Sequence, residues 1–215
     1  MIKAKLVEQL KFIRQAAIKA GIWDYVFLGY GTMLGAVRDG GIIDHDSDAD
    51  ICLLADKFDK QAEDRFYEAL WGYKLFTARH KEVRRSDTNR ILWVSVKREK
   101  QGMKTCIWFQ QRWNGYYWHS KGKNWVWKIG KNLNPPLDQN HTAVGKGIPE
   151  SYFDTLVSIN WYGQDDWKIP MNFGRCLDFY YPNWYFPKKG GSSASSYILD
   201  VPSWKDKSGW KIRMR

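Results

Sequence analysis

The sequence has few of the residues that build disulfide frameworks or zinc sites. It contains three cysteines, Cys52, Cys106 and Cys176, and no two of them have the spacing of a metal-binding or redox motif. The four histidines are scattered, and none has a cysteine or histidine partner at metal-ligand spacing. An odd number of cysteines without such a motif argues against a disulfide scaffold and against a zinc site.

Long apolar runs are missing as well. No stretch of 18 apolar residues exists, and residues 1–5 lead into a charged helical pattern that is unlike a signal peptide. We therefore expect a soluble, cytoplasmic protein without a transmembrane segment. No feature of the sequence indicates an oligomeric state.

Acidic residues are in deficit overall but concentrated in one place. The chain has 34 Lys and Arg against 23 Asp and Glu, a formal net charge of +11, whereas residues 44–64 are rich in acids. A basic protein around an acidic pocket suits an anionic substrate held by a metal ion, and it also suits adhesion to nucleic acid.

Aromatic residues, in contrast, are abundant. There are 13 Trp and 12 Tyr, and most of them follow residue 90. They could pack in the core, form a platform for carbohydrate, or form a cage for a quaternary ammonium group such as choline. Composition does not choose between these interpretations.

Residues 29–54 combine two kinds of chemistry. The first half is rich in glycine and enters a short helix at Thr32, after the turn Gly29-Tyr30-Gly31. Free N–H groups and the positive end of the helix dipole would then point at one spot, which suits a phosphate group. The hydroxyl of Thr32 could cap the helix, contact the phosphate, or do both.

The second half of this stretch carries aspartates at every other position. Asp44 is followed by Asp46, Asp48 and Asp50 and then by the apolar residues 51–54, which are typical of a strand. The period of two in a strand would place Asp46, Asp48 and Asp50 on one face, where their charges repel one another. A divalent cation such as Mg²⁺ or Mn²⁺ would relieve this repulsion, and Asp48 with Asp50 forms a plausible ligand pair. A solvated acidic turn is the alternative.

These residues resemble the motif of the LicD/fukutin family of the nucleotidyltransferase-fold superfamily. The residues that match are Tyr30-Gly31-Thr32-x-Leu34-Gly35-Ala36-x-Arg38-x-x-Gly41-x-Ile43 and then Asp46-x-Asp48-x-Asp50-Ile51. A second segment is similar to a later motif of the same family, Ile148-Pro149 followed by Leu156 and by Tyr162-Gly163-x-Asp165-Asp166-Trp167-x-x-Pro170.

The resemblance implies a metal-dependent phosphotransferase. Such an enzyme moves phosphocholine or a polyol phosphate from a CDP-activated donor to a sugar hydroxyl of a cell-surface glycan, such as lipopolysaccharide or teichoic acid. It implies catalytic roles for Asp46, Asp48 and Asp50, a Mg²⁺ or Mn²⁺ ion on Asp48 and Asp50, and donor-phosphate contacts from three further residues, namely Gly31, Thr32 and Arg38. An ion pair with an aspartate is the alternative role for Arg38.

The chain departs from the family pattern at one important position. Relatives supply a third carboxylate from a later strand, before an apolar-aromatic pair, and here Cys106 stands at that place. Either Asp87 or Glu99 takes this role, or the third carboxylate is missing. Its loss would weaken activation of the metal or the nucleophile.

Periodicity predicts the remaining elements and the fold class. We expect an α/β (α+β) fold of the nucleotidyltransferase type, a mixed sheet with flanking helices, over residues 1–170, and an aromatic-rich extension with a partly flexible basic tail, packed on it, over residues 171–215. Helices are predicted over residues 2–20, 57–71 and 150–161, strands over 23–28, 73–78, 90–96 and 104–109, and an aromatic, basic hairpin turning at Asn114-Gly115 within residues 110–130.

Two other functions remain consistent with the sequence. A nucleotidyltransferase of the same fold would transfer NMP from an NTP to a small molecule or to RNA. A non-catalytic basic, aromatic protein would bind glycan or nucleic acid without chemistry. The missing third carboxylate favours the second of these, and the intact aspartate run opposes it.

Overall fold

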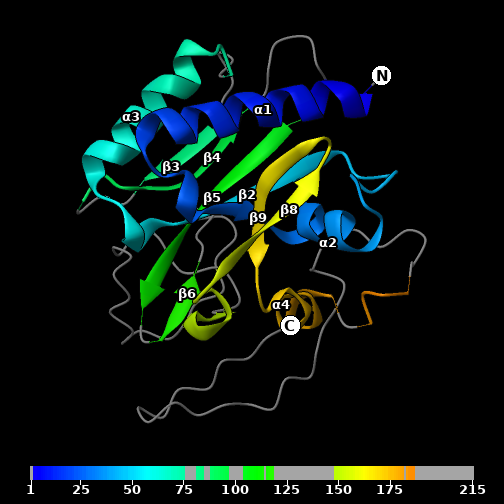
Figure 1. Ribbon diagram of the computed structural model, residues 1–215. Helices are drawn as coiled ribbons and strands as arrows, with labels where there is room; N and C mark the ends of the chain where they lie inside the picture. The colour runs from blue at the N-terminus through cyan, green and yellow to red at the C-terminus, as the bar shows by residue number, and fades with distance from the viewer. Residues whose placement is uncertain are drawn as a thin grey trace.

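The centre of the structure is a mixed β-sheet with the strand order β1-β2-β5-β4-β3 (Figure 1). The computed structural model describes residues 2–75, 81–84, 88–96, 104–113, 115–118, 148–181 and 183–186. The strands of the sheet are β1 (Val26–Leu28), β2 (Asp48–Leu54), β3 (Lys81–Arg84), β4 (Ile91–Val96), β5 (Lys104–Trp113), β6 (Tyr116–Trp118) and β7 (Ile148–Pro149). Strands β2 and β5 are parallel and the other neighbours are antiparallel, so the predicted mixed sheet is confirmed.

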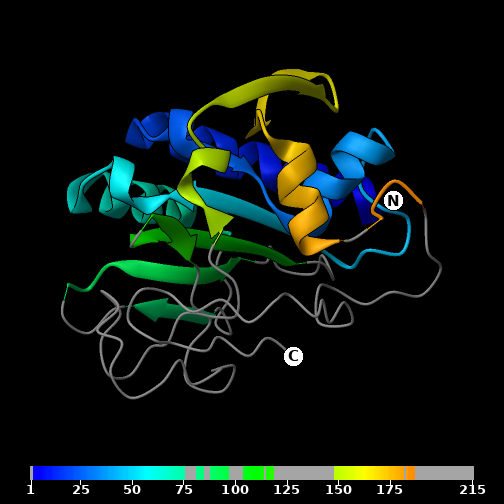
Figure 2. The ribbon, with the colours of Figure 1, turned by 90° about the horizontal axis from the view of Figure 1, so that it is seen from below.

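Two helices cover one face of this sheet and two lie on the other (Figures 1 and 2). They are α1 (Ile2–Ala20) and α3 (Lys60–Gly72) on the first face, and α2 (Tyr30–Arg38) and α4 (Phe173–Tyr180) on the second. Phe66 of α3 meets Phe109 of β5 with ring centroids 6.3 Å apart, and Tyr30 of α2 meets Trp108 of β5 at 5.7 Å. The neighbouring residues Trp108 and Phe109 of β5 therefore contact helices on opposite faces of the sheet, because successive side chains of a strand alternate between its two faces.

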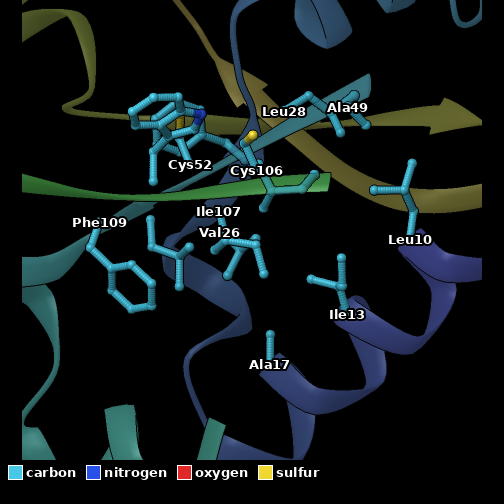
Figure 3. Packing of buried hydrophobic residues seen from close by; sticks show 14 of the residues in the cluster. Leu10, Ile13, Ala17, Val26, Leu28, Ala49, Cys52, Cys106, Ile107 and Phe109 are labelled. Carbon is cyan, nitrogen blue, oxygen red and sulfur yellow. The ribbon is translucent and has the colours of Figure 1, made fainter. Parts of the chain in front are cut away.

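The face toward α1 and α3 is the apolar core. In Figure 3, Ile107, Phe109 and Val26 lie on the side of the sheet that faces Ile13 and Ala17 of α1, and all five are fully buried. The helix α1 was predicted from apolar residues at helical spacing, and its bounds agree with the prediction. The odd-numbered residues of β2 and β5 point toward α1 and α3, so the even-numbered residues of these strands point to the opposite face of the sheet.

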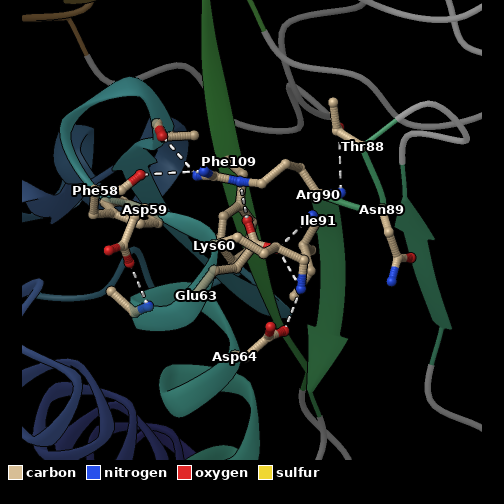
Figure 4. A network of polar contacts seen from close by, with 12 residues as sticks. Phe58, Asp59, Lys60, Glu63, Asp64, Thr88, Asn89, Arg90, Ile91 and Phe109 are labelled. Carbon is tan, nitrogen blue, oxygen red and sulfur yellow. Dashed lines mark hydrogen bonds and ion pairs between the residues drawn. The ribbon is translucent and has the colours of Figure 1, made fainter.

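A buried ion pair attaches α3 to β4 (Figure 4). Glu63 has no exposed surface and accepts hydrogen bonds from Arg90 Nε at 2.7 Å and from the N–H of Ile91 at 2.9 Å. Arg90 also donates to the carbonyl oxygens of Phe58 and Ala55. The network joins the start of α3 to the sheet without leaving the charge of Glu63 unpaired.

The predicted helix over residues 150–161 is wrong. A short 3-10 helix, Glu150–Tyr152, is followed by β8 (Leu156–Trp161), which pairs with β9 (Gln164–Pro170) in a two-stranded sheet. Val157 and Ile159 are β-branched and lie at alternate positions with Trp161, so the same apolar residues fit a strand as well as a helix. The turn decides between them, because Tyr162 and Gly163 both have positive φ, +53° and +70°, as a two-residue hairpin requires.

Three other predicted boundaries need correction. Trp23–Tyr25 is a 3-10 helix, so the predicted strand over residues 23–28 begins only at Val26. Helix α3 begins at Lys60 because Asp59 accepts a hydrogen bond from the N–H of Ala62 and caps it. Tyr73 and Lys74 form the turn that ends α3, whereas residues 76–78 of the predicted strand lie outside the described residues.

The hairpin predicted between residues 110 and 130 is present where it is described, since Trp113 of β5 pairs with Tyr116 of β6 and Gly115 has a φ of +78°, whereas Asn114 lies outside the described residues. The rest of the predicted aromatic hairpin, residues 119–130, and the tail beyond residue 186 lie outside the described residues. Within the described part of the chain, none of the helices has both the length and the apolar composition needed to span a membrane.

Candidate functional site

The start of α2 is tied directly to β2. The N–H of Gly29 donates to the carbonyl oxygen of Asp50 at 3.0 Å, and a Cβ at position 29 would lie 2.5 Å from the Sγ of Cys52. Tyr30 begins the helix with a φ of +42°, and its ring contacts Trp108 and Tyr180. These contacts hold the first turn of α2 against β2, the strand that carries Asp48 and Asp50. The predicted order of glycine turn, short helix and aspartate-bearing strand is present.

Thr32 has a different structural role from the predicted cap. The residue before the helix, Gly29, makes no side-chain cap, and the Thr32 hydroxyl accepts a hydrogen bond from the N–H of Asp50 at 2.8 Å. Thr32 is buried, with 3% of its surface exposed. Its hydroxyl thus fixes the backbone of Asp50, and contact with a donor phosphate stays a prediction.

Two of the three aspartates share a strand face. Asp48 and Asp50 are alternate residues of β2 on the face opposite α1, whereas Asp46 precedes the strand and is not part of it. The expected alignment of all three on one strand is therefore wrong. Asp46 nevertheless reaches the site, because its Oδ2 is 2.9 Å from the point where a Cβ of Gly31 would lie. The candidate phosphate-binding glycine and the acidic cluster are adjacent.

The carboxylates disfavour one another's charge. Burial raises the pKa of Asp50 to about 7, and the negative charges of Asp48 and Asp46 raise it as well. A hydrogen bond from Trp108 Nε1, at 2.8 Å, has the opposite effect and lowers this pKa. Burial and the charge of Asp48 likewise raise the pKa of Asp46. A positive charge bound here would stabilise the ionised carboxylates.

Lys104 supplies one positive charge next to these carboxylates. Lys104 begins β5, is paired in register with Asp48, and places its Nζ 3.2 Å from the Asp48 carboxylate. The side chain of Lys104 is 47% exposed and that of Asp48 is 28% exposed. Sequence reasoning missed Lys104, because only the register of the parallel pair β2 and β5 brings it beside Asp48.

Arg38 lies at the end of α2 and pairs with its neighbour in the chain. Its guanidinium donates to both oxygens of Asp39 at 2.8 and 2.7 Å, and to the carbonyl oxygen of Trp184 at 3.4 Å. The structure thus gives it an ion pair with an aspartate outside the run of Asp46, Asp48 and Asp50. Its predicted contact with a donor phosphate stays a prediction.

The two segments that resemble the family motifs contact each other next to α2, through Ile42 and Tyr162. The N–H of Ile42 donates to the hydroxyl of Tyr162 at 2.9 Å, and this hydroxyl is 2.8 Å from the point where a Cβ of Gly41 would lie. Tyr162 belongs to the β8–β9 turn, 120 residues after Ile42. The second motif therefore supports the loop that leads from α2 to the aspartates.

Gly35 makes the tightest backbone contact of this region, and Gly35→Ala tests it. A Cβ would lie 2.4 Å from the carbonyl oxygen of Gly41 and 3.0 Å from Ile43 Cγ1, so backbone must move. We expect a loss of about 2 kcal/mol in the free energy of unfolding, measured by denaturant titration. Gly72→Ala is the control, because no atom lies within 4 Å of its Cβ position and alanine favours the helix. Equal stability of both variants would contradict the close packing.

A comparison with known protein families identifies the family of this chain. Residues 25–139 match the family model described as LicD/FKTN/FKRP, nucleotidyltransferase domain. The chain belongs to the LicD/FKTN/FKRP family. The comparison with curated proteins finds no match. The family match begins next to β1 and includes α2, β2 and β5, the elements that carry the site.

In this LicD-family chain, a cysteine stands beside Asp50 on the neighbouring strand. Cys106 of β5 is in register with Asp50 of β2 and with Ser95 of β4, and it is buried. Cys106 is the residue at which the family resemblance led us to expect a third carboxylate, and its absence there stays a prediction. The alternatives for that role, Asp87 and Glu99, lie outside the described residues.

The residues present fit a Mg²⁺ or Mn²⁺ ion in part. Asp48 and Asp50 offer hard oxygen ligands on one face, and the hydrogen bond from Trp108 uses only one oxygen of Asp50. No group of three His, Cys, Asp or Glu residues suited to a metal occurs among the described residues. An ion held by two carboxylates would take its remaining ligands from substrate phosphate and water, as Mg²⁺ commonly does.

Proposed function

We propose that this LicD-family protein moves a phosphocholine or polyol-phosphate group from a CDP-activated donor to a sugar hydroxyl of a glycan. The observation that carries the proposal is the contact between the first turn of α2 and the aspartates, with Asp46 Oδ2 2.9 Å from the Cβ position of Gly31. A phosphate at the helix start would lie beside Asp48 and Asp50, where charge develops in the transfer.

Each part of the site has one task in this proposal. Gly31 and the backbone at the start of α2, with the positive end of the helix dipole, bind the donor phosphate. Asp48 and Asp50 hold Mg²⁺ or Mn²⁺, which, when bound, offsets charge on the phosphate. Asp46 completes the acidic cluster and Arg38 binds donor phosphate from the other end of α2. The acceptor hydroxyl attacks the phosphorus of the transferred group, and CMP leaves.

Product analysis tests this function. The purified protein is incubated with CDP-choline, CDP-ribitol or CDP-glycerol, a glycan acceptor and Mg²⁺ or Mn²⁺, and released nucleotide is measured. We expect CMP from at least one donor. Release of pyrophosphate from CTP or ATP, with no CMP from any CDP compound, would show instead that the protein transfers NMP.

The cysteine beside Asp50 favours a second candidate, a non-catalytic glycan or nucleic-acid binder. Cys106 is in register with Asp50, and a binder would not need the third carboxylate that the resemblance leads us to expect there. Binding of glycan or nucleic acid should then persist in Asp48→Ala and Asp50→Ala and should not depend on metal. The phosphotransferase proposal requires the opposite, loss of metal-dependent donor binding in both variants.

Lys104 provides a test of the proposed metal site that does not depend on activity. Its ammonium group opposes a second cation near Asp48, so Lys104→Met should bind Mn²⁺ about threefold more tightly than the wild type, a modest factor because the pair is partly exposed. Calorimetric or EPR titration measures the affinity. Lys11→Met, exposed on α1, loses the same charge and should change little. If both variants bind Mn²⁺ equally well, Lys104 does not oppose a cation at Asp48.

A further inference from the structure

Tyr181 reaches the acidic cluster from the C-terminal part of the chain. It directly follows α4, and its N–H donates to the carbonyl oxygen of Leu177 at 2.6 Å, which continues the helical pattern by one residue. The preceding Tyr180 is buried, and its ring lies 4.7 Å from that of Tyr30 at the start of α2. Packing of α4 on α2 thereby sets the position of Tyr181.

The hydroxyl of Tyr181 lies at the spot assigned to phosphate. It lies 3.9 Å from the Cβ position of Gly31, beside Asp46 Oδ2. A tyrosine phenol carries its proton at neutral pH, so the hydroxyl can donate a hydrogen bond. Among the described residues, its hydroxyl forms no hydrogen bond, and Tyr181 remains partly exposed.

A neutral hydrogen-bond donor has a specific use among carboxylates. Three acidic groups repel an incoming phosphate, and a carboxylate offers it no hydrogen bond unless protonated. The phenol O–H of Tyr181 supplies such a bond without adding charge. Its position beside Gly31 allows it to act together with the N–H groups of α2.

We propose that Tyr181 binds the donor phosphate at Gly31, through a hydrogen bond from its hydroxyl to a phosphate oxygen. The inference rests on the proposed function only in naming a nucleoside diphosphate as the ligand. Tyr181 lies 42 residues beyond the family match, which ends at residue 139. The site is then completed by a segment outside the matched domain.

Tyr181→Phe tests the inference because it removes only the hydroxyl. We expect the dissociation constant of CDP with Mg²⁺, measured by calorimetry, to rise about tenfold, as for a hydrogen bond to a charged group. In turnover with the active donor, KM should rise by a similar factor and kcat should change little. Tyr25→Phe, whose ring stacks on Phe58, is the matched control and should bind CDP like the wild type. Thermal melting shows whether each variant is folded.

The outcomes separate this inference from the proposed function. If the wild type binds CDP, Tyr181→Phe binds it about tenfold more weakly, and no CDP compound yields CMP, then Tyr181 binds phosphate and the proposed function fails. If the wild type releases CMP and folded Tyr181→Phe binds CDP with unchanged affinity, the inference is overturned and the function stands. A wild type that binds neither CDP nor CTP nor pyrophosphate overturns both.

Discussion

Asp50→Asn should reduce kcat/KM for transfer by about a thousandfold or more, without unfolding the protein. The substitution removes one of two carboxylates proposed to hold the metal ion, and charge stabilisation of this kind contributes several kcal/mol to catalysis. An asparagine oxygen can still accept the hydrogen bond from Trp108 Nε1, and the backbone N–H still donates to Thr32. The loss therefore reports on charge and not on packing.

The same variant should be more stable than the wild type in metal-free buffer at pH 8. The pKa of Asp50 is raised from its ordinary 3.8 to about 7, so the folded protein holds a proton that the unfolded chain releases between about pH 4 and pH 7. Wild-type stability therefore falls across this window as pH rises, and Asp50→Asn removes that loss. Thermal melting should show a higher melting temperature for the variant at pH 8 and similar values for both proteins at pH 4.

Asp44→Asn is the control for this experiment. Asp44 is in the same acidic segment, its side chain is 96% exposed, and it pairs with Lys3 at the protein surface. It should keep nearly full activity. Activity of Asp50→Asn within about tenfold of the wild type would exclude Asp50 from the metal site and from the chemistry.

Glu63→Ala should lower the free energy of unfolding by about 3 kcal/mol, the largest stability effect that we predict. Removing one partner of a buried ion pair leaves the other without compensation, a change of several kcal/mol. Here it would leave the N–H of Ile91 and the Nε of Arg90 without their acceptors at the junction of α3 and β4 (Figure 4). Arg90 keeps its bonds to two carbonyl oxygens, which limits the loss.

Two further variants of α3 make the comparison specific. Glu63→Gln retains an oxygen for the N–H of Ile91 and should lose less stability than Glu63→Ala. Glu68→Ala, exposed on the same helix, should change the free energy of unfolding by less than about 0.5 kcal/mol. Equal urea midpoints for Glu63→Ala and Glu68→Ala would contradict a stabilising role for the buried pair.

Local patterns predicted the elements whose signal lies in neighbouring residues. Helix α1 follows from apolar residues repeating along one face, and β2 follows from the apolar run after Asp50. Gly29 follows from the close approach of α2 to β2, where a side chain would meet Cys52, and the turn at Gly115 follows from the positive φ that glycine allows. Where one apolar pattern fitted both helix and strand, as in residues 150–161, periodicity led to the wrong element.

The site divides in the same way. The sequence by itself placed Asp48 and Asp50 on one face of a strand, because side chains two residues apart in a strand point the same way. Only the tertiary structure decided which distant residues join them. Strand register placed Lys104 and Cys106 beside the aspartates, and the packing of α4 on α2 brought in Tyr181. Register and helix packing depend on contacts across the whole fold, so no local pattern in the chain encodes them.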